Sequence, residues 1–322
     1  MQTYLKTKPV WMQILLFLGI AFGLFLITTY IAITLVLPKM TGISILELQD
    51  SKTWDLANPN YLTYIRVMIL LQFLFLFTIP ALLFAYFSDS NPIRYLGLKA
   101  PSSSIYWIFG ILLIVVAYPF VEYLGYVNQK IPVGADTERW MKGMEEEAAR
   151  QIQFMLKKRS TGELMKNLVF ISLFAGIGEE LFFRGILQRM FIRMTHNPWM
   201  GIILTAAIFS GIHFQFYGFF PRLFLGVLLG AIYWYSGSLW VAILAHFLYD
   251  AAVIVLVYFN PQLLENTEAT LIKGQDFQLL IGAMISLAIT FAILQQMQKR
   301  SVTSYEEIYN DDFPKQKDDL SF

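Results

Sequence analysis

The chain has 322 residues, of which 57% are hydrophobic and 15% are charged, and its formal net charge at pH 7 is +1. Soluble domains carry roughly 25% charged and 45–50% apolar residues, so this composition indicates that lipid surrounds most of the chain. The near-zero net charge gives no sign of a nucleic-acid partner, and the absence of cysteine excludes disulfides and thiol catalysis.

Long apolar runs predict an all-α polytopic membrane protein. A membrane-spanning helix needs about 20 mainly apolar residues, and about eight runs approach that length. They cover roughly residues 11–37, 66–87, 105–126, 167–192, 199–217, 220–236, 239–259 and 277–297. The first run is too long for a signal-peptide core and lacks a small-residue cleavage site, so we expect it to remain as a span.

The longest connection between predicted spans, residues 127–166, has the pattern of an amphipathic helix. Apolar side chains recur at helical spacing from Trp140 to Met155, and the glutamates at 145–147 precede the basic residues at 157–159. This charge order suits the helix dipole. Such a helix lies on the membrane surface or across the bundle, either as a cap over apolar surface or as a lid or substrate-docking element.

These features divide the chain into five parts. Residues 1–126 contain the first three spans, 127–166 the amphipathic connection, 167–259 the next four spans and 260–298 the last. Residues 299–322 form a polar, acidic tail that we expect to be disordered. Lys and Arg residues are spread almost evenly over the two sides, so the positive-inside rule does not fix the orientation.

Charged side chains inside the span 167–192 are the first candidates for a functional site. Glu179, Glu180 and Arg184 lie in an otherwise apolar sequence, although one charge at a helix centre costs about 2.5–3.5 kcal/mol on insertion scales. Glu180 and Arg184 are four residues apart, so they share a helix face and can pair. Glu179 points about 100° away from Glu180 around the helix axis, and it has no partner in its own helix. An unpaired carboxylate in an apolar environment is well suited to act as a general base or acid.

Two of the three histidines lie in predicted spans that should neighbour this helix. His213 belongs to the fifth span, and His246 belongs to the seventh, four residues before Asp250 and on the same helix face. His196 lies in a polar turn, and we expect it to be a surface residue. Glu179, His213, His246 and Asp250 could therefore converge from three helices on one cavity.

Two chemistries fit this set of side chains. A carboxylate and an imidazole could activate water while the second imidazole polarises a carbonyl oxygen. Alternatively, Glu179, His213 and His246 could hold a zinc ion with an open position for water, as in a metalloprotease. The chain lacks the His-Glu-x-x-His signature of many zinc proteases. The sequence alone leaves the use of zinc open.

Together these motifs resemble those of the CAAX-processing and bacteriocin-immunity (CPBP) family of intramembrane proteases, which includes the type II CAAX prenyl endopeptidases. The family pattern is Glu-Glu-x-x-x-Arg, then Phe-x-x-x-His, then His-x-x-x-Asn or Asp. Here it is matched by Glu179, Glu180 and Arg184, by Phe209 and His213, and by His246 and Asp250. The resemblance covers about residues 165–255, and it implies an eight-helix fold and peptide-bond hydrolysis inside the membrane or at its edge.

The resemblance also implies a role for each matched residue. Glu179 would be the general base on water, assisted by His213, while His246 and Asp250 would stabilise the oxyanion and Glu180 with Arg184 would brace the site. Many family members have Asn in place of Asp250. An asparagine amide can donate a hydrogen bond to an oxyanion, whereas an ionised aspartate only accepts. This difference puts the oxyanion role of Asp250 in question.

We expect the substrates to be membrane-embedded or lipidated peptides and proteins, and the chain to be a multi-pass protein of the bacterial inner membrane. Two alternatives to an endopeptidase remain. A non-catalytic peptide-binding or immunity protein could keep the same fold. A proton-coupled transporter could use the buried acids as a relay, but the chain shows no internal repeat of the kind that marks many transporters.

Overall fold

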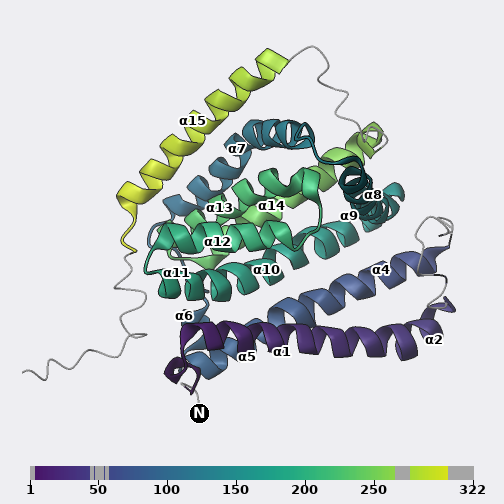
Figure 1. Cartoon of the computed structure of the whole chain (residues 1–322), viewed down its shortest axis with the longest axis horizontal. Coiled ribbons are helices and arrows are strands. Elements are labelled where there is room, and N and C mark those ends of the chain that lie inside the picture. Colours follow the sequence, from purple (N-terminus) through teal and green to yellow (C-terminus); the bar gives the residue numbers. More distant parts are fainter. Residues whose placement is uncertain (1–3, 44–46, 48–53, 55–57, 265–275, 304–322) are drawn as a thin grey trace, which may run out of the picture.

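A computed structural model of the chain describes residues 4–43, 47, 54, 58–264 and 276–303. In these ranges every regular element is a helix, which confirms the predicted all-α class (Figure 1). Of the tail predicted for residues 299–322, the part from residue 304 onward lies outside the described residues. The helices form an N-terminal layer, a central bundle, and one long helix, α15, that lies along α7 on the outside (Figure 1).

Two long helices make up the N-terminal layer. Both contain a π-helical segment, at Ala32–Val36 and Gln72–Thr78, and a short 3-10 turn at Tyr4–Thr7 precedes the first. The first runs through α1 (Val10–Ile31) and α2 (Leu37–Thr41), and the second through α4 (Pro59–Leu71) and α5 (Ile79–Ser88). The second span was predicted to start at residue 66, but α4 begins earlier, at Pro59. Asn58 caps this end of the helix by accepting a hydrogen bond from the Asn60 amide.

The central bundle is built around one continuous helix that carries both glutamates. It comprises α9 (Thr161–Asn167), α10 (Phe174–Glu180) and α11 (Arg189–Thr195), joined by the π-helical segments Leu168–Leu173 and Leu181–Gln188. Around it pack the remaining helices of the bundle, α7 (Ile105–Gln129), α12 (Pro198–Gly211), α13 (Phe219–Ser236) and α14 (Leu239–Phe259). Short elements at Pro92–Tyr95 (α6), Phe216–Gly218 and Pro261–Leu264, and the outer helix α15 (Asp276–Arg300), complete the described helices.

Six helices in the described ranges are long and apolar enough to cross a membrane, and they correspond to six of the predicted spans. The chain is therefore an integral, multi-pass membrane protein. The predicted span 167–192 is also a helix, but its three central charges keep it outside this set. The predicted span 199–217 is too long, because α12 ends at Gly211 and the chain turns back through Phe214, whose φ is 52°.

The amphipathic connection predicted for residues 127–166 is confirmed as α8 (Ala135–Lys157). It lies across one end of the bundle and contacts α4, α9, α14 and the turn at Phe216–Gly218. Glu145 accepts a hydrogen bond of 2.9 Å from the Tyr217 amide. The rings of Trp140 and Phe216 pack with their centroids 5.0 Å apart. α8 is thus anchored to the loop that follows α12.

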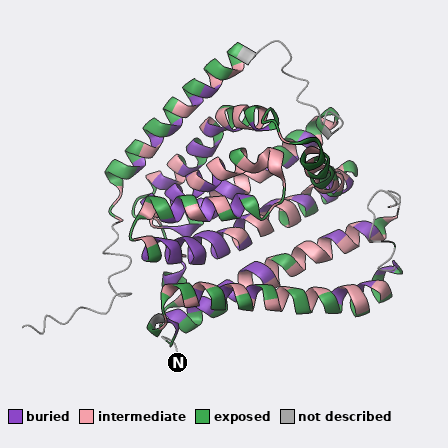
Figure 2. Cartoon of the chain, viewed as in Figure 1, coloured by how far each residue is buried: buried purple, intermediate pink, exposed green. Residues whose placement is uncertain are grey.

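An ion pair joins the N-terminal layer to the central helix. Arg66 of α4 contacts the carboxylate of Glu163, which also pairs with Lys166 at 2.9 Å. Figure 2 shows that buried residues concentrate in the central bundle, while exposed residues cover much of α1 and α15. The exposed residues of these two helices are largely apolar, as expected for surfaces that face lipid.

Close approach of α10 and α14 depends on Gly176. A Cβ atom at this position would lie 3.2 Å from the Phe247 nitrogen and 3.3 Å from the Ile243 carbonyl oxygen. Both are backbone atoms of α14, so they cannot move without shifting the helix that carries His246. Ser172, one turn earlier, donates a hydrogen bond of 2.6 Å to the Phe247 carbonyl.

We therefore expect Gly176→Ala to destabilise the protein by about 1–3 kcal/mol, the usual cost of overpacking. The measurement is the thermal unfolding midpoint of the purified protein in detergent. Gly19→Ala in α1 is the matched control, because a Cβ there would meet no atom within 4 Å. Equal midpoints for the two variants would contradict this account of the α10–α14 contact.

Candidate active site

The site residues come from three places in the bundle. Glu179 and Glu180 are the last two residues of α10, and Arg184 follows in the π-helical segment. Single π-helical segments inside α-helices often occur at functional sites. His246 lies in the middle of α14. His213 lies in the loop after α12, so the expectation that it sits inside a span is wrong.

Glu180 is the centre of a buried hydrogen-bond chain. Its Oε1 atom lies 2.7 Å from Arg184 Nη1 and 2.8 Å from His246 Nδ1. Arg184 also donates to the Gly226 carbonyl at 2.9 Å, and its guanidinium lies 4.9 Å from the centroid of the Phe209 ring. The side chains of Glu180 and Arg184 are completely buried. The pair predicted from helical spacing is present, and it links the central helix to α13 and α14.

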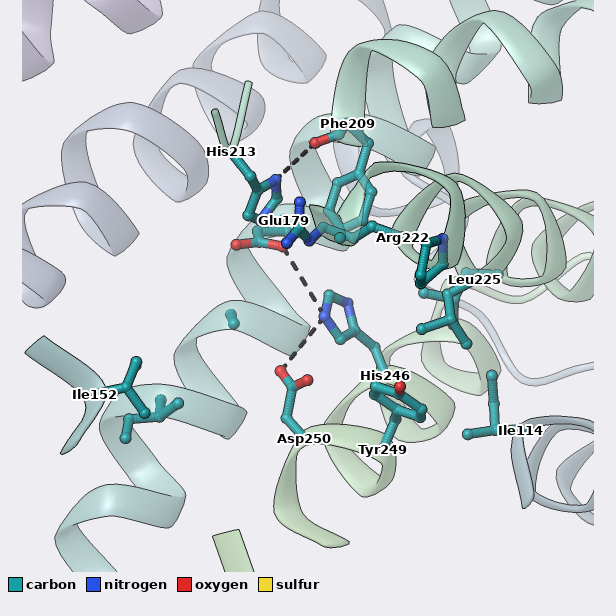
Figure 3. A pocket seen from close by; sticks show the side chains of 15 residues that line it. Ile114, Ile152, Glu179, Phe209, His213, Arg222, Leu225, His246, Tyr249 and Asp250 are labelled. Carbon is teal, nitrogen blue, oxygen red and sulfur yellow. Dashed lines mark hydrogen bonds and ion pairs between the residues drawn. The ribbon is translucent and has the colours of Figure 1, made fainter. Parts of the chain in front are cut away.

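The other ring nitrogen of His246 faces the two remaining acids. Its Nε2 atom lies 3.5 Å from Asp250 Oδ2 and 3.9 Å from Glu179 Oε2. Dashed lines in Figure 3 mark both contacts. Because a carboxylate accepts hydrogen bonds, Glu180 fixes the proton of His246 on Nδ1 and sets the direction of the ring. Nε2 of His246 is therefore directed at Glu179 and Asp250.

His213 is held by the main chain of its own segment. Its Nδ1 atom lies 2.7 Å from the Phe209 carbonyl oxygen, which can only accept a hydrogen bond. Nδ1 therefore carries the proton of the neutral ring, and Nε2 is left as an acceptor. The Phe209 ring packs edge-on against both imidazoles, with centroids 5.0 Å from His213 and 6.1 Å from His246. Phe209 thus spaces the two histidines.

The four residues that the sequence predicted to converge all line one cavity of about 450 Å³ (Figure 3). They are Glu179, His213, His246 and Asp250. A second cavity, of about 370 Å³, also reaches Glu179 and His213 and extends to Gln72 of the N-terminal layer and Gln151 of α8. The predicted convergence is present. His196 is exposed at the end of α11, as expected for a surface residue.

Sequence reasoning missed two polar residues of the larger cavity, Arg222 and Tyr249. Arg222 is the only charged residue in Phe219–Ser236, and this isolation in an apolar helix was the signal that could have found it. Tyr249 adjoins Asp250 in sequence and also faces the cavity (Figure 3). Nothing in the local pattern of α14 distinguishes it from a lipid-facing tyrosine.

The geometry does not support the zinc site considered from the sequence. Among the described residues, no three His, Asp or Glu side chains are grouped so that they could hold a metal ion. We therefore derive no reaction step through a metal.

Comparisons with known proteins identify the same part of the chain. Residues 161–252 match the family described as type II CAAX prenyl endopeptidase Rce1-like. The uncharacterized protein YpbD of Bacillus subtilis (strain 168) is 30% identical over 108 residues, which make up 32% of this chain and 52% of YpbD. The alignment thus spans about half the length of this relative. No solved structure matches the chain. The matched segment contains every motif residue, so the resemblance inferred from the motifs is confirmed there.

Proposed function

Because residues 161–252 match the Rce1-like type II CAAX prenyl endopeptidases, we propose that this membrane protein is an endopeptidase acting inside the bilayer or at its edge. Its substrates in this proposal are membrane-associated or lipidated peptides and proteins, and its location is the bacterial inner membrane. The observation that carries the proposal is the arrangement around His246. Glu180 binds one ring nitrogen, and the other faces Glu179 and Asp250 in a shared cavity.

Glu179 is the proposed general base. It takes a proton from water as the water oxygen attacks the peptide carbonyl carbon, and it returns the proton to the departing amine nitrogen. Nε2 of His213 accepts the second hydrogen of the same water and so orients it, because Nδ1 is committed to the Phe209 carbonyl. Glu179 makes no hydrogen bond of its own within the described chain, so its carboxylate is available to the water.

His246 is the proposed stabiliser of the oxyanion. A doubly protonated ring donates Nδ1–H to Glu180 and Nε2–H to the developing negative charge on the substrate oxygen. Asp250 lies 3.5 Å from Nε2, and when ionised it can only accept a hydrogen bond. We therefore assign Asp250 to positioning the His246 ring. Arg184 balances the charge of Glu180 and keeps it in place.

The test is direct detection of hydrolysis. Membranes containing the wild-type protein or Glu179→Gln are incubated in water enriched in ¹⁸O, and the released peptides are analysed by mass spectrometry. Hydrolysis by activated water places at least one ¹⁸O in each new carboxyl terminus. We expect such termini only with the wild-type protein. An identical set of peptides from both membranes would count against a peptidase and favour a peptide-binding or transport function.

Asp250 allows a more specific prediction. Asn is the residue that many members of the resembled family carry at this position, and its amide can donate a hydrogen bond to the oxyanion. We expect Asp250→Asn to retain kcat within about tenfold of the wild type, whereas Asp250→Leu should lower kcat by about 10²-fold or more. Cleavage rates of one fluorogenic peptide by the purified variants provide the measurement. If Asn and Leu were equally damaging, the ionised aspartate itself would be required.

A further inference from the structure

Two arginines are buried where the central helix ends, on the side of the bundle away from α8 (Figure 1). Arg189 and Arg193 belong to α11, and each is only 7% exposed. They are four residues apart, so they lie on one face of the helix. Like charges at this spacing repel each other, and the low dielectric constant of a buried site increases the repulsion. An anion bound beside both arginines would relieve it.

Contacts with neighbouring segments orient the two guanidinium groups. Arg189 Nη1 donates to the Tyr95 carbonyl at 3.3 Å, and its guanidinium carbon lies 4.3 Å from the centroid of the Tyr95 ring. Arg193 Nη1 donates to Gln13 Oε1 at 3.4 Å. Gln13 is itself buried in α1 and donates to the Lys8 carbonyl at 2.7 Å. The arginines are therefore held where α1 and α6 meet the central helix.

The surrounding end of the bundle has the same sign of charge. Its further described basic residues are Lys8, Arg94, Lys99, Lys299 and Arg300, and its described acid is Asp89. Like charges gathered at one end create a positive potential that attracts acidic segments. This end of the protein is therefore electrostatically complementary to an acidic peptide.

The chain leaves its last described helix, α15, beside this site. Ser301, directly after α15, donates a hydrogen bond of 2.9 Å to the Tyr235 carbonyl. A Cβ atom at Gly237 would lie 3.2 Å from Thr303 Oγ1. The Tyr235 ring packs against Trp199 at the start of α12, with the centroids 6.3 Å apart. Thr303, the last described residue, therefore lies near the turn that joins α11 to α12.

The polar tail from residue 304 onward has the charge and the length to reach the two arginines. It contains two lysines and six acidic residues, which are Glu306, Glu307, Asp311, Asp312, Asp318 and Asp319. At about 3.3 Å per residue, Asp311 can reach about 26 Å from Thr303. Carboxylates bind guanidinium groups through two parallel hydrogen bonds.

We propose that Arg189 and Arg193 form a binding site for the acidic tail of the same chain, which docks there through its carboxylates. α15 contacts α7 and α13, and a docked tail would also tie it to α11 and α1. Because the tail is tethered beside the site, its effective concentration there is high. This favours the tail over the phosphate of an anionic lipid, the other anion that binds basic sites between membrane helices. The proposal is independent of the peptidase function, since neither arginine lines the cavity of Glu179 and His246.

The experiment measures the distance between the tail and α11 in the full-length protein. Because the chain has no cysteine, Met194→Cys and Asn310→Cys provide two unique sites for nitroxide labels. Met194 lies on α11 and is 46% exposed. Distances are obtained by electron double resonance in phosphatidylcholine nanodiscs. The labelled protein is compared with one that also carries Arg189→Gln and Arg193→Gln, and with one in which all six tail acids are replaced by their amides.

Two controls match these variants in the kind of charge removed. Arg94→Gln removes an exposed arginine of α6 at the same end of the bundle. Lys315→Gln with Lys317→Gln changes the charge of the tail without removing a carboxylate. The thermal unfolding midpoints of the unlabelled proteins provide a second readout, and they verify that each variant is folded.

We expect a narrow distribution of short distances in the labelled parent and in both controls. Removing the arginines or the tail carboxylates should give the broad distribution of a flexible chain. Amides in the tail should also lower the unfolding midpoint of the wild-type protein, because two buried cations then lose their anion. The same amides should leave the midpoint of the Arg189→Gln, Arg193→Gln protein unchanged, because the two sites are coupled.

A broad distribution in the labelled parent, or a narrow one that persists without the tail carboxylates, would overturn the proposal. The tail variant decides this even if the arginine variant fails to fold, because its substitutions lie outside the described helices. The midpoints are also measured after phosphatidylglycerol is added to the nanodiscs. A stabilisation that requires the two arginines, together with no effect of the tail amides, would mean that the site binds a lipid phosphate instead of the tail.

Discussion

Replacing Glu179 by Gln is expected to lower the rate of peptide hydrolysis by about 10²–10⁴-fold, the usual contribution of a general base. Gln has nearly the same shape as Glu but cannot take a proton from water. Within the described residues, the ionic contact of Glu179 is with His246 at 3.9 Å, which is too long for a hydrogen bond, so the fold does not depend on a hydrogen bond to this carboxylate. We therefore expect kcat to fall while peptide affinity and the unfolding midpoint change little.

Glu138→Gln serves as the control for this prediction. Glu138 pairs with Lys142 on the exposed face of α8, away from the cavity, and its side chain is 44% exposed. Its replacement removes the same charge without touching the site. Comparable activity of the Glu179 and Glu138 variants would mean that no carboxylate at position 179 is needed, and the peptidase function would have to be abandoned.

Replacing Arg184 by Met is expected to destabilise the protein by about 3–5 kcal/mol, because it leaves the buried carboxylate of Glu180 without its cation. The side chains of both residues have no exposed surface. Arg184 also donates to the Gly226 carbonyl, so α13 loses a contact as well. The measurement is the free energy of unfolding in mixed micelles of detergent and sodium dodecyl sulfate.

The double variant Glu180→Gln with Arg184→Met separates charge from packing. Removing both charges should restore a large part of the lost stability, because replacing a buried ion pair by neutral groups is often close to neutral. Activity should stay low, since His246 has lost its carboxylate partner. Arg139→Gln, which breaks an exposed pair with Asp136 on α8, is the control and should change stability little. If Arg184→Met had the same free energy of unfolding as this control, the ion pair of Glu180 and Arg184 would not contribute to the stability of the fold.

Hydropathy and helical spacing were sufficient for the parts of this protein that follow from local pattern. Apolar length predicts the helical class, and the four-residue spacing of Glu180 and Arg184 predicts their ion pair. The same spacing places His246 beside Asp250. These predictions succeed because the side chains involved belong to one continuous helix, where position in the sequence determines position in space.

Other features depend on contacts between distant segments, which the local pattern does not contain. The predicted end of this span is too late because Phe214, Phe216 and Tyr217 continue the apolar run beyond Gly211, the last residue of α12, and the turn itself occurs at a phenylalanine, Phe214. His213 is consequently in a loop instead of a helix. The contact of Arg222 with Gln215 arises from that same turn. A cavity residue that reaches its site through a loop has no periodicity to reveal it.

The shared oxygen of Glu180 has a consequence for any attempt to alter this protein. Oε1 of Glu180 accepts from both Arg184 and His246, so these three residues form one unit with a single acceptor. The effects of substitutions within such a unit do not add, and a change at one member alters the outcome of a change at another. A redesign for new specificity would either vary the three residues together, or leave all three unchanged and vary the residues of the cavity wall.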